Sequence, residues 1–145
     1  MKIIFIGIHN KPMKTPLCSS TKSGKLVNRI IEALKPIECQ KTNLYDVEYY
    51  PKREEKFDLA MNWHERIEPK LGDIIVLMGA EVHENYVQNL FDKVVKIAHP
   101  SSKRSHEAMN EYVISAVEKI KNKHIAELKL AHNGINSVKR SKNKC

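Results

Sequence analysis

The sequence has few cysteines and no long apolar run. Its three cysteines, Cys18, Cys39 and Cys145, are an odd number, and their spacing matches no zinc or iron–sulfur pattern. We therefore expect reduced thiols, no metal and no cofactor. No apolar run approaches the roughly 18 residues that a membrane helix needs. The apolar part of the N-terminus is also too short for a secretory signal peptide, so we expect a cytoplasmic protein without a membrane partner.

The positive charge of the chain is concentrated near its end. The 145 residues suit one domain that buries a core without disulfide or metal staples. Of the net charge of +8, most comes from Lys121, Lys123, Lys129, Lys139, Arg140, Lys142 and Lys144, opposed in that segment by Glu127 alone. A basic tail favours polyanions, although it also suits a solvated end that only aids solubility. We expect a domain over 1–121 and a basic extension over 122–145, helical and then disordered.

Four apolar segments predict strands, over residues 2–7, 37–45, 73–79 and 93–98. The first and third are nearly continuous apolar runs that end at glycine. Such runs are typical of strands that are buried on both faces, as in a parallel sheet covered by helices.

Helical spacing of apolar residues predicts four helices, over residues 23–34, 57–67, 82–91 and 105–121. The last helix is expected to continue past Lys121 with weaker amphipathicity. Trp63 and Phe57, on the second helix, are expected in the core. The alternation of strands and helices predicts an α/β protein with three α/β/α layers, right-handed crossovers and a four-stranded, mainly parallel sheet.

Ligands of open parallel sheets bind beyond the carboxyl ends of the strands. The first such loop contains Asn10, an amide suited to holding a water for attack. Further along the same loop, Ser23 and Lys25 open a helix whose backbone N–H groups suit a phosphate. Helix capping is the alternative interpretation of the serines and threonines here. The segment is not a P-loop, because Ser19 and Leu26 stand where that motif requires Gly and Ser or Thr.

Two further strand ends carry polar side chains. The amide of Asn43 matches the O4 and N3–H edge of uracil, although Asn at a strand end is also an ordinary turn former. Pro100 ends strand pairing and projects His99 at the ligand side, where a neutral His can donate to an oxygen that gains negative charge. A structural His is the alternative. The candidate phosphate contacts that follow are Ser101, Ser102, Lys103 and Arg104.

Four segments together resemble the uracil-DNA glycosylase superfamily, over about residues 1–118. TPLCSSTKSGKLVNRII is similar to the PF-x-G-x-x-G-x-L-L stretch of its iron–sulfur family, and KTNLYDVEYYP to the TN-v-v-k-c-r-P segment. EPKLGDIIVLMGAEV resembles the kP-x-x-i-v-l-L-G segment, and HPSSKRS the HPS motif. Their order and spacing agree with the family. The chain thus looks like a small relative without the cluster cysteines.

The resemblance implies a role for each matching residue. Asn10, with His9 beside it, lies in the water-activating motif, and Asn43 matches the Asn that reads the pyrimidine edge. His99 matches the His that stabilises the departing base as an anion, and Ser101 matches a contact to the phosphate backbone. Leu17 stands at the base-stacking position, which is usually Phe. Lys103 stands where relatives place an apolar wedge, which predicts a preference for single-stranded or mismatched DNA.

Three functions use these residues. The first is a DNA glycosylase that hydrolyses the N-glycosidic bond of uracil or a modified pyrimidine after the base is flipped out of the stack. Its site acts by electrostatic preorganisation, without a covalent intermediate. The second is a non-catalytic protein that binds a nucleotide or modified base, for example to sequester it. The third is an N-glycosidic hydrolase of free nucleosides or nucleotides. The expected partner is accordingly DNA or a free nucleotide.

Overall fold

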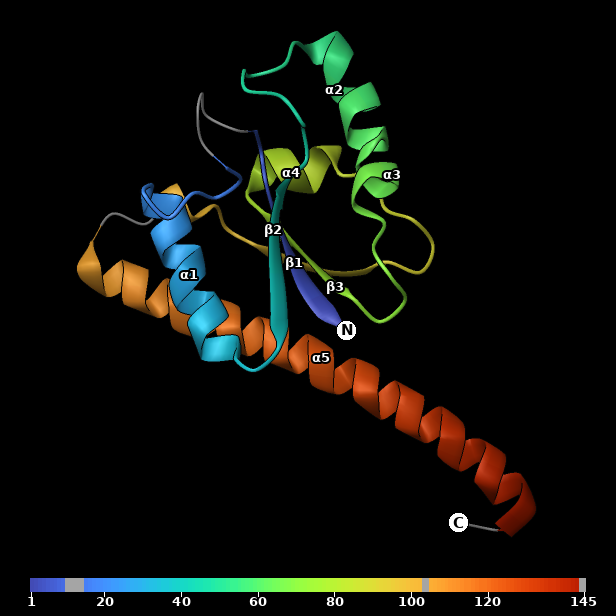
Figure 1. The fold of residues 1–145 in the computed structure, drawn as a ribbon. Coiled ribbons are helices and arrows are strands. Elements are labelled where there is room, and N and C mark those ends of the chain that lie inside the picture. The colour runs from blue at the N-terminus through green and yellow to red at the C-terminus, as the bar shows by residue number, and fades with distance from the viewer. Residues whose placement is uncertain (10–14, 103–104, 144–145) are drawn as a thin grey trace.

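The computed structural model describes residues 1–9, 15–102 and 105–143, with side chains described as far as residue 125. Its elements, in chain order, are β1 (Lys2–Gly7), α1 (Lys22–Leu34), β2 (Glu38–Asn43), α2 (Arg53–Met61), α3 (Trp63–Ile67), β3 (Ile74–Met78), α4 (Ala80–Asn85), β4 (Lys93–Ile97), the 3₁₀ turn η1 (Pro100–Ser102) and α5 (His106–Asn143). The predicted alternation of strands and helices is confirmed (Figure 1).

The four strands form one sheet in the order β2-β1-β3-β4, and every pairing in it is parallel. In the register, Ile3 pairs with Cys39 on one side and with Ile74 on the other. The central strands β1 and β3 are buried almost throughout, whereas edge strand β2 is buried only at its carboxyl end. The predicted parallel sheet is therefore correct, and its apolar central runs have the expected cause.

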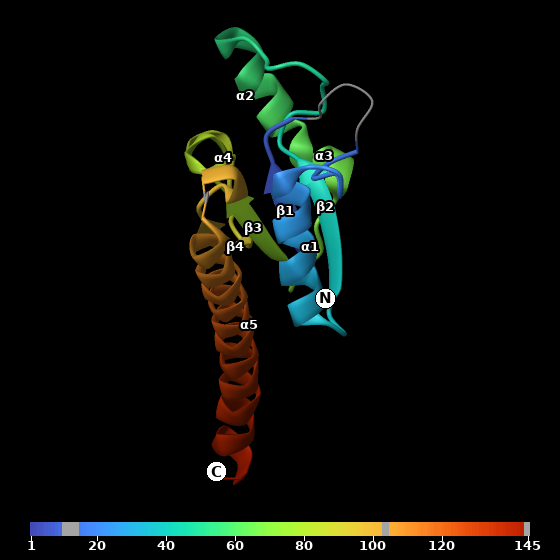
Figure 2. The same ribbon diagram turned by 90° about the vertical axis from the view of Figure 1, so that its left-hand side faces the viewer.

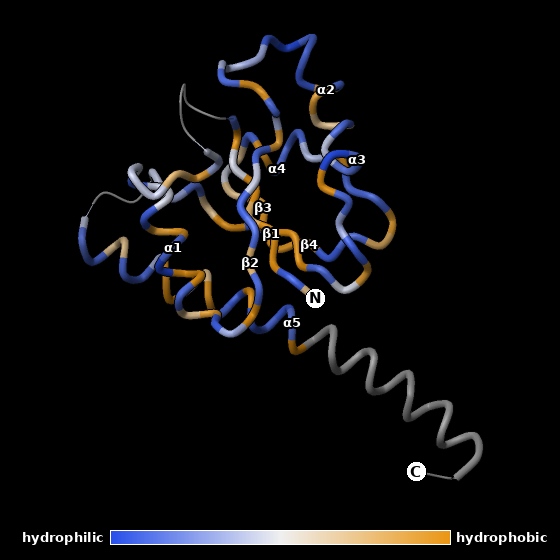
Figure 3. Tube along the Cα trace, viewed as in Figure 1, coloured by the Kyte–Doolittle hydropathy of each residue, from blue (hydrophilic) through white to orange (hydrophobic). Residues whose placement is uncertain are grey.

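Helices cover both faces of the sheet and complete three layers. On one face Ile3 and Phe5 pack with α1 and α5, and on the other Ile4 and Ile6 pack with α2, α3 and α4. Figure 2 shows α1 and α5 side by side, and Figure 3 shows the apolar strands between the helical layers. Successive strand residues point to opposite faces, so one apolar run supplies both cores. The predicted α/β/α architecture is confirmed.

The single helix predicted over 57–67 is wrong. Two helices occupy this region, α2 and α3, and they meet at Asn62. Trp63 is fully buried, as expected, but Phe57 is 65% exposed and lies outside the core. The reason is that the buried residue of α2 is Ala60, near its end, so its earlier turns lie outside the core.

The helix predicted over 82–91 is also wrong in extent, because α4 ends at Asn85. Beyond it, the backbone N–H of Asn89 and the hydroxyl of Tyr86 both donate to Asp92 Oδ2, at 2.8 and 2.7 Å. These bonds hold the chain in a loop, and Leu90 at its tip is 89% exposed. The helical spacing of apolar residues thus predicted helix over residues 86–91, where the chain forms a loop with its tip in solvent.

The last helix continues past Lys121, as predicted, and crosses the expected domain boundary without a break to Asn143. Its first half packs against α1 and the sheet through Tyr112, Ala116 and Ile120. Within the described part of the chain, no helix is both long and apolar enough to cross a membrane.

The topology creates a crevice at the carboxyl edge of the sheet. The chain leaves β1 toward α1 on one face and leaves the neighbouring strand β3 toward α4 on the other. Loops that diverge from adjacent parallel strands leave a crevice between them, which is where α/β proteins bind ligands.

Candidate functional site

A cavity of about 260 Å³ lies at this carboxyl edge. It is lined by Gly7, Ile8, His9, Thr15, Leu17, Cys18, Thr21, Ser23, Asn43, His99 and Ser101. Six of the predicted site residues are among them, from four separate segments of the chain: His9, Leu17, Ser23, Asn43, His99 and Ser101. The fold therefore brings together residues that the sequence keeps up to about ninety positions apart.

The tautomer of His99 follows from its hydrogen bonds. The backbone N–H of Ser101 donates to His99 Nδ1 at 3.1 Å, and the Ser101 hydroxyl lies 2.6 Å from the same nitrogen. A backbone N–H is always a donor, so Nδ1 is the acceptor and the neutral ring carries its proton on Nε2. Burial lowers the pKa of His99 below its ordinary value. The site thus holds a neutral imidazole with one N–H to donate.

The end of β3 leaves room for His99. Gly79 has a φ of 92°, and a Cβ on it would lie 2.9 Å from the Cβ of His99. Its N–H donates to the carbonyl of Ile97 at 2.9 Å, which ties the ends of β3 and β4 together. His83 Nε2 adds a second tie, because it lies 3.0 Å from the carbonyl oxygen of Leu77 and 2.9 Å from that of Ile97.

Asn43 is positioned in the same way by the end of β1. It is the last residue of β2, pairs with Gly7 and is only 4% exposed. A Cβ on Gly7 would lie 2.7 Å from Asn43 Oδ1, so the amide lies directly against the glycine backbone. Arg66 of α3 donates to the Asn43 carbonyl at 2.7 Å and fixes the strand end from the other face.

Two further lining residues are His9 and Leu17. The His9 ring meets Tyr50 edge-on, with centroids 5.9 Å apart. Leu17 adopts a left-handed φ of 49°, a conformation that costs a side-chain-bearing residue about 1–2 kcal/mol. Its carbonyl accepts from Lys41 Nζ at 3.1 Å, and this bond helps to hold the strained turn.

The N-terminus of α1 also faces the cavity. Thr21 is its N-cap, and its hydroxyl accepts from the Gly24 N–H at 3.0 Å while donating to the Cys18 carbonyl at 2.7 Å. The first turn contains no acidic residue, so the positive end of the helix dipole is not neutralised there. The helix-capping interpretation is correct for Thr21, while Ser23 lines the cavity.

Some predicted site residues do not reach the cavity. Ser102 is exposed, and its hydroxyl donates to the His99 carbonyl at 2.8 Å within η1. Lys25 is exposed and not part of the lining. It lies two positions from Ser23, and two helical positions turn a side chain by about 200°. Asn10, Lys103 and Arg104 lie outside the described residues.

Five lining residues were not among the predicted site residues: Gly7, Ile8, Thr15, Cys18 and Thr21. Only Thr21 carried a usable signal, since it stands directly before an amphipathic segment and so fits an N-cap. Thr15 and Cys18 reach the cavity through the path of a loop, which no periodicity encodes.

The positive end of α1 sets the electrostatic character of the cavity wall. Among the described residues, its lining contains no carboxylate, and no group of three or more His, Cys, Asp or Glu side chains could hold a metal. The described wall thus suits an anionic or uncharged polar ligand.

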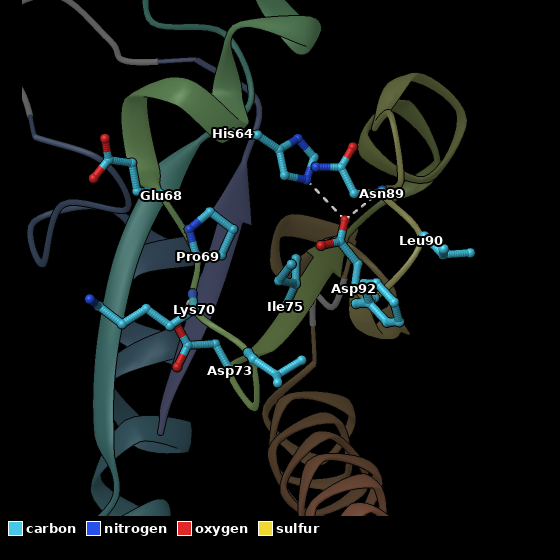
Figure 4. Close-up of a pocket in the computed structure, with 11 residues that line it drawn as sticks. His64, Glu68, Pro69, Lys70, Asp73, Ile75, Asn89, Leu90 and Asp92 are labelled. Atoms are coloured by element: carbon cyan, nitrogen blue, oxygen red, sulfur yellow. Dashed lines mark hydrogen bonds and ion pairs between the residues drawn. The ribbon is translucent and has the colours of Figure 1, made fainter.

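A second cavity, of about 510 Å³, lies at the opposite edge of the sheet (Figure 4). It is larger, but it contains none of the predicted site residues. Its wall includes His64, whose Nε2 lies 2.9 Å from Asp92 Oδ2, the oxygen that also accepts from Tyr86. This network holds the 86–92 loop, so we assign it a structural role and place the site at the carboxyl edge.

The hydrogen bonds at Nδ1 predict how His99 titrates. Removing the Ser101 hydroxyl in Ser101→Ala takes away a donor to the neutral ring, so the pKa of His99 should rise toward its ordinary value. NMR titration of the imidazole measures this directly. Ser102→Ala is the matched control, because its hydroxyl bonds the His99 carbonyl and not the ring. A lower pKa in Ser101→Ala would contradict the assigned tautomer.

The same depressed pKa links stability to pH. Since the folded His99 binds its proton less readily than the unfolded chain does, unfolding takes up a proton in acid. The contribution of neutral His99 to the free energy of unfolding is therefore fully present above the unfolded pKa of about 6.5. It is lost as the pH falls from there through the lower pKa of the folded state.

No protein-family model matches the chain, and no curated protein matches its sequence. The function is therefore inferred from the residues and their geometry.

Proposed function

We propose that the chain is a DNA glycosylase of the uracil-DNA glycosylase type, which hydrolyses the N-glycosidic bond of uracil or a modified pyrimidine. The observation that carries the proposal is the meeting of Asn43 and His99 in one cavity, each seated against a glycine at a strand end. An amide that reads a pyrimidine edge and a neutral imidazole that donates one proton are the two groups that binding and departure of such a base require.

The geometry supports a separate role for each group that lines the cavity. The base enters the cavity with its O4 and N3–H edge on the Asn43 amide. As the glycosidic bond breaks, its electron pair moves into the pyrimidine, and His99 Nε2–H donates to the oxygen on which negative charge collects. Water attacks the sugar carbon and releases a proton to solvent, and the pyrimidine anion takes up a proton, so the products are the base and an abasic sugar. The positive end of α1 and Ser23 lie where a backbone phosphate would be held.

A second candidate function has one observation in its favour. The described lining contains no carboxylate, and a carboxylate is one of the groups that can stabilise a cationic sugar or orient the attacking water. A protein with the same pocket that binds a nucleotide or modified base without cleaving it fits this lining. Free nucleotides such as dUMP are its test ligands.

The test is a base-release assay on labelled oligonucleotides. Single-stranded and duplex DNA with uracil, hydroxymethyluracil or thymine at one position is incubated with the protein, and abasic sites are cleaved with alkali. We expect breaks at uracil or hydroxymethyluracil, faster in single strands, and none in a cytosine control. Absence of breaks with the protein in excess over DNA would reject hydrolysis. Calorimetric titration with dUMP would then test the binding function.

A further inference from the structure

An exposed stripe on α5, formed by Ile114, Glu118, Lys121 and Ile125, is not covered by another helix among the described residues. Ile114 is 67% and Ile125 47% exposed, although both lie in the half of α5 for which side chains are described. With Val117 and with Ala33 of α1, they line a groove of about 430 Å³. The two isoleucines are about three turns apart, so they lie on the same side of the helix. Its lining residues come from α1 and α5, which Figure 2 shows side by side.

The polar residues of the groove are arranged symmetrically between the two isoleucines. Glu118 follows Ile114 by one helical turn, and Lys121 precedes Ile125 by the same interval. Both charged side chains belong to exposed residues that line the groove. The ion pairs between described residues do not include either of them. Reading these four positions from the other end therefore replaces Ile114 with Ile125 and Glu118 with Lys121, while Val117 of the groove corresponds to Asn122.

We propose that this stripe binds a second copy of the chain, with the two α5 helices antiparallel. A two-fold axis perpendicular to α5, level with the midpoint between Glu118 and Lys121, then places Ile114 against the partner's Ile125. The same operation places Glu118 against the partner's Lys121, and each contact occurs twice. Such an isologous interface needs one surface that is complementary to itself, which this spacing provides.

Charge complementarity selects this occupant and this direction. In a parallel, in-register pair, Lys121 would face the partner's Lys121, and Glu118 would face the partner's Glu118. Like charges held opposite one another disfavour that arrangement. The antiparallel pair instead forms two opposite-charge contacts flanked by two apolar ones. The stripe lies away from the carboxyl-edge cavity, so dimerisation and the proposed base release can fail independently.

The length of α5 makes the contact extensive. Its 38 residues correspond to about 57 Å of helix, whereas a strand of the sheet spans about 20 Å. Figures 1 and 2 both show α5 extending well past the sheet. Helical segments without tertiary packing are marginally stable in water, and the stated axis would place the partner's helix alongside residues 106–133 of this one.

Charge reversal of the full chain tests the pairing by sedimentation velocity across a wide range of protein concentration. We expect the wild type to be a dimer and Glu118→Lys or Lys121→Glu alone to weaken dimerisation by about tenfold or more. The double variant, which exchanges the two charges, should restore dimerisation. Lys119→Glu is the matched control for Lys121→Glu, because it makes the same charge change at a residue that lines a different groove.

Three results would overturn the proposal. The first is a monomeric wild type at every concentration. The second is a single reversal that dimerises as well as Lys119→Glu does. The third is a double variant no better than the single ones. The substituted residues are exposed, and circular dichroism verifies that each variant keeps its helical content.

Discussion

His99→Ala is expected to lower the rate of base release by about 10²–10³-fold, the usual loss when one donor to a developing oxyanion is removed. The loss should fall on the cleavage step and not on DNA binding, because the negative charge on the base develops only as the bond breaks. Single-turnover release from a uracil-containing single strand, combined with DNA binding measured by fluorescence anisotropy, separates the two effects.

Two further variants make the His99 result specific. His99→Gln retains a side-chain N–H donor and should recover part of the lost rate. His106→Ala removes an exposed histidine at the start of α5 and should leave the rate unchanged. If His99→Ala released the base at the wild-type rate, His99 would have no part in the cleavage step. The hydrogen bonds from Ser101 would then only hold a turn.

Gly79→Ala is expected to destabilise the fold by about 2–4 kcal/mol and to slow base release as well. One part of the cost is the backbone conformation, with φ 92° and ψ 161°, which is essentially restricted to glycine and penalises a side chain by about 1–3 kcal/mol. The other part is the new Cβ, which would lie 2.9 Å from the Cβ of His99. That atom is attached directly to the backbone, so the contact is relieved only by moving the strand end that carries the imidazole.

Gly72→Ala separates these two costs. Gly72 has a φ of 95°, but a Cβ on it meets nothing within 4 Å. This variant should therefore lose only the conformational part of the stability, about 1–3 kcal/mol, and keep the wild-type rate. Urea unfolding midpoints and single-turnover rates provide both comparisons. Equal destabilisation of the two variants, with unchanged base release, would mean that His99 accommodates the extra carbon.

The sheet and part of its binding edge could be predicted because their signals are local. Each central strand is a short apolar run that ends in glycine, and such runs indicate strands buried on both faces. Once the strands are parallel, their carboxyl ends meet at one edge, which is enough to place Asn43 and His99 together. Both residues line the cavity, as expected.

Helix boundaries and loop paths were less predictable because they depend on what lies opposite. Phe57 and Leu90 have the spacing of buried helix residues, yet both are exposed because no layer faces them. Thr15 and Cys18 reach the cavity only because the chain folds back before α1. Ser23 and Lys25 looked equivalent in sequence and point to different sides of that helix.

The sequence by itself determined the order of strands and helices, the apolar central runs and the chemistry at the strand ends, because these depend on residue type and spacing. The tertiary structure decided the rest. It seats the Asn43 amide against Gly7 and the His99 side chain against Gly79. It also leaves Ile114 without cover. These outcomes depend on distances between residues far apart in the chain, which only packing fixes.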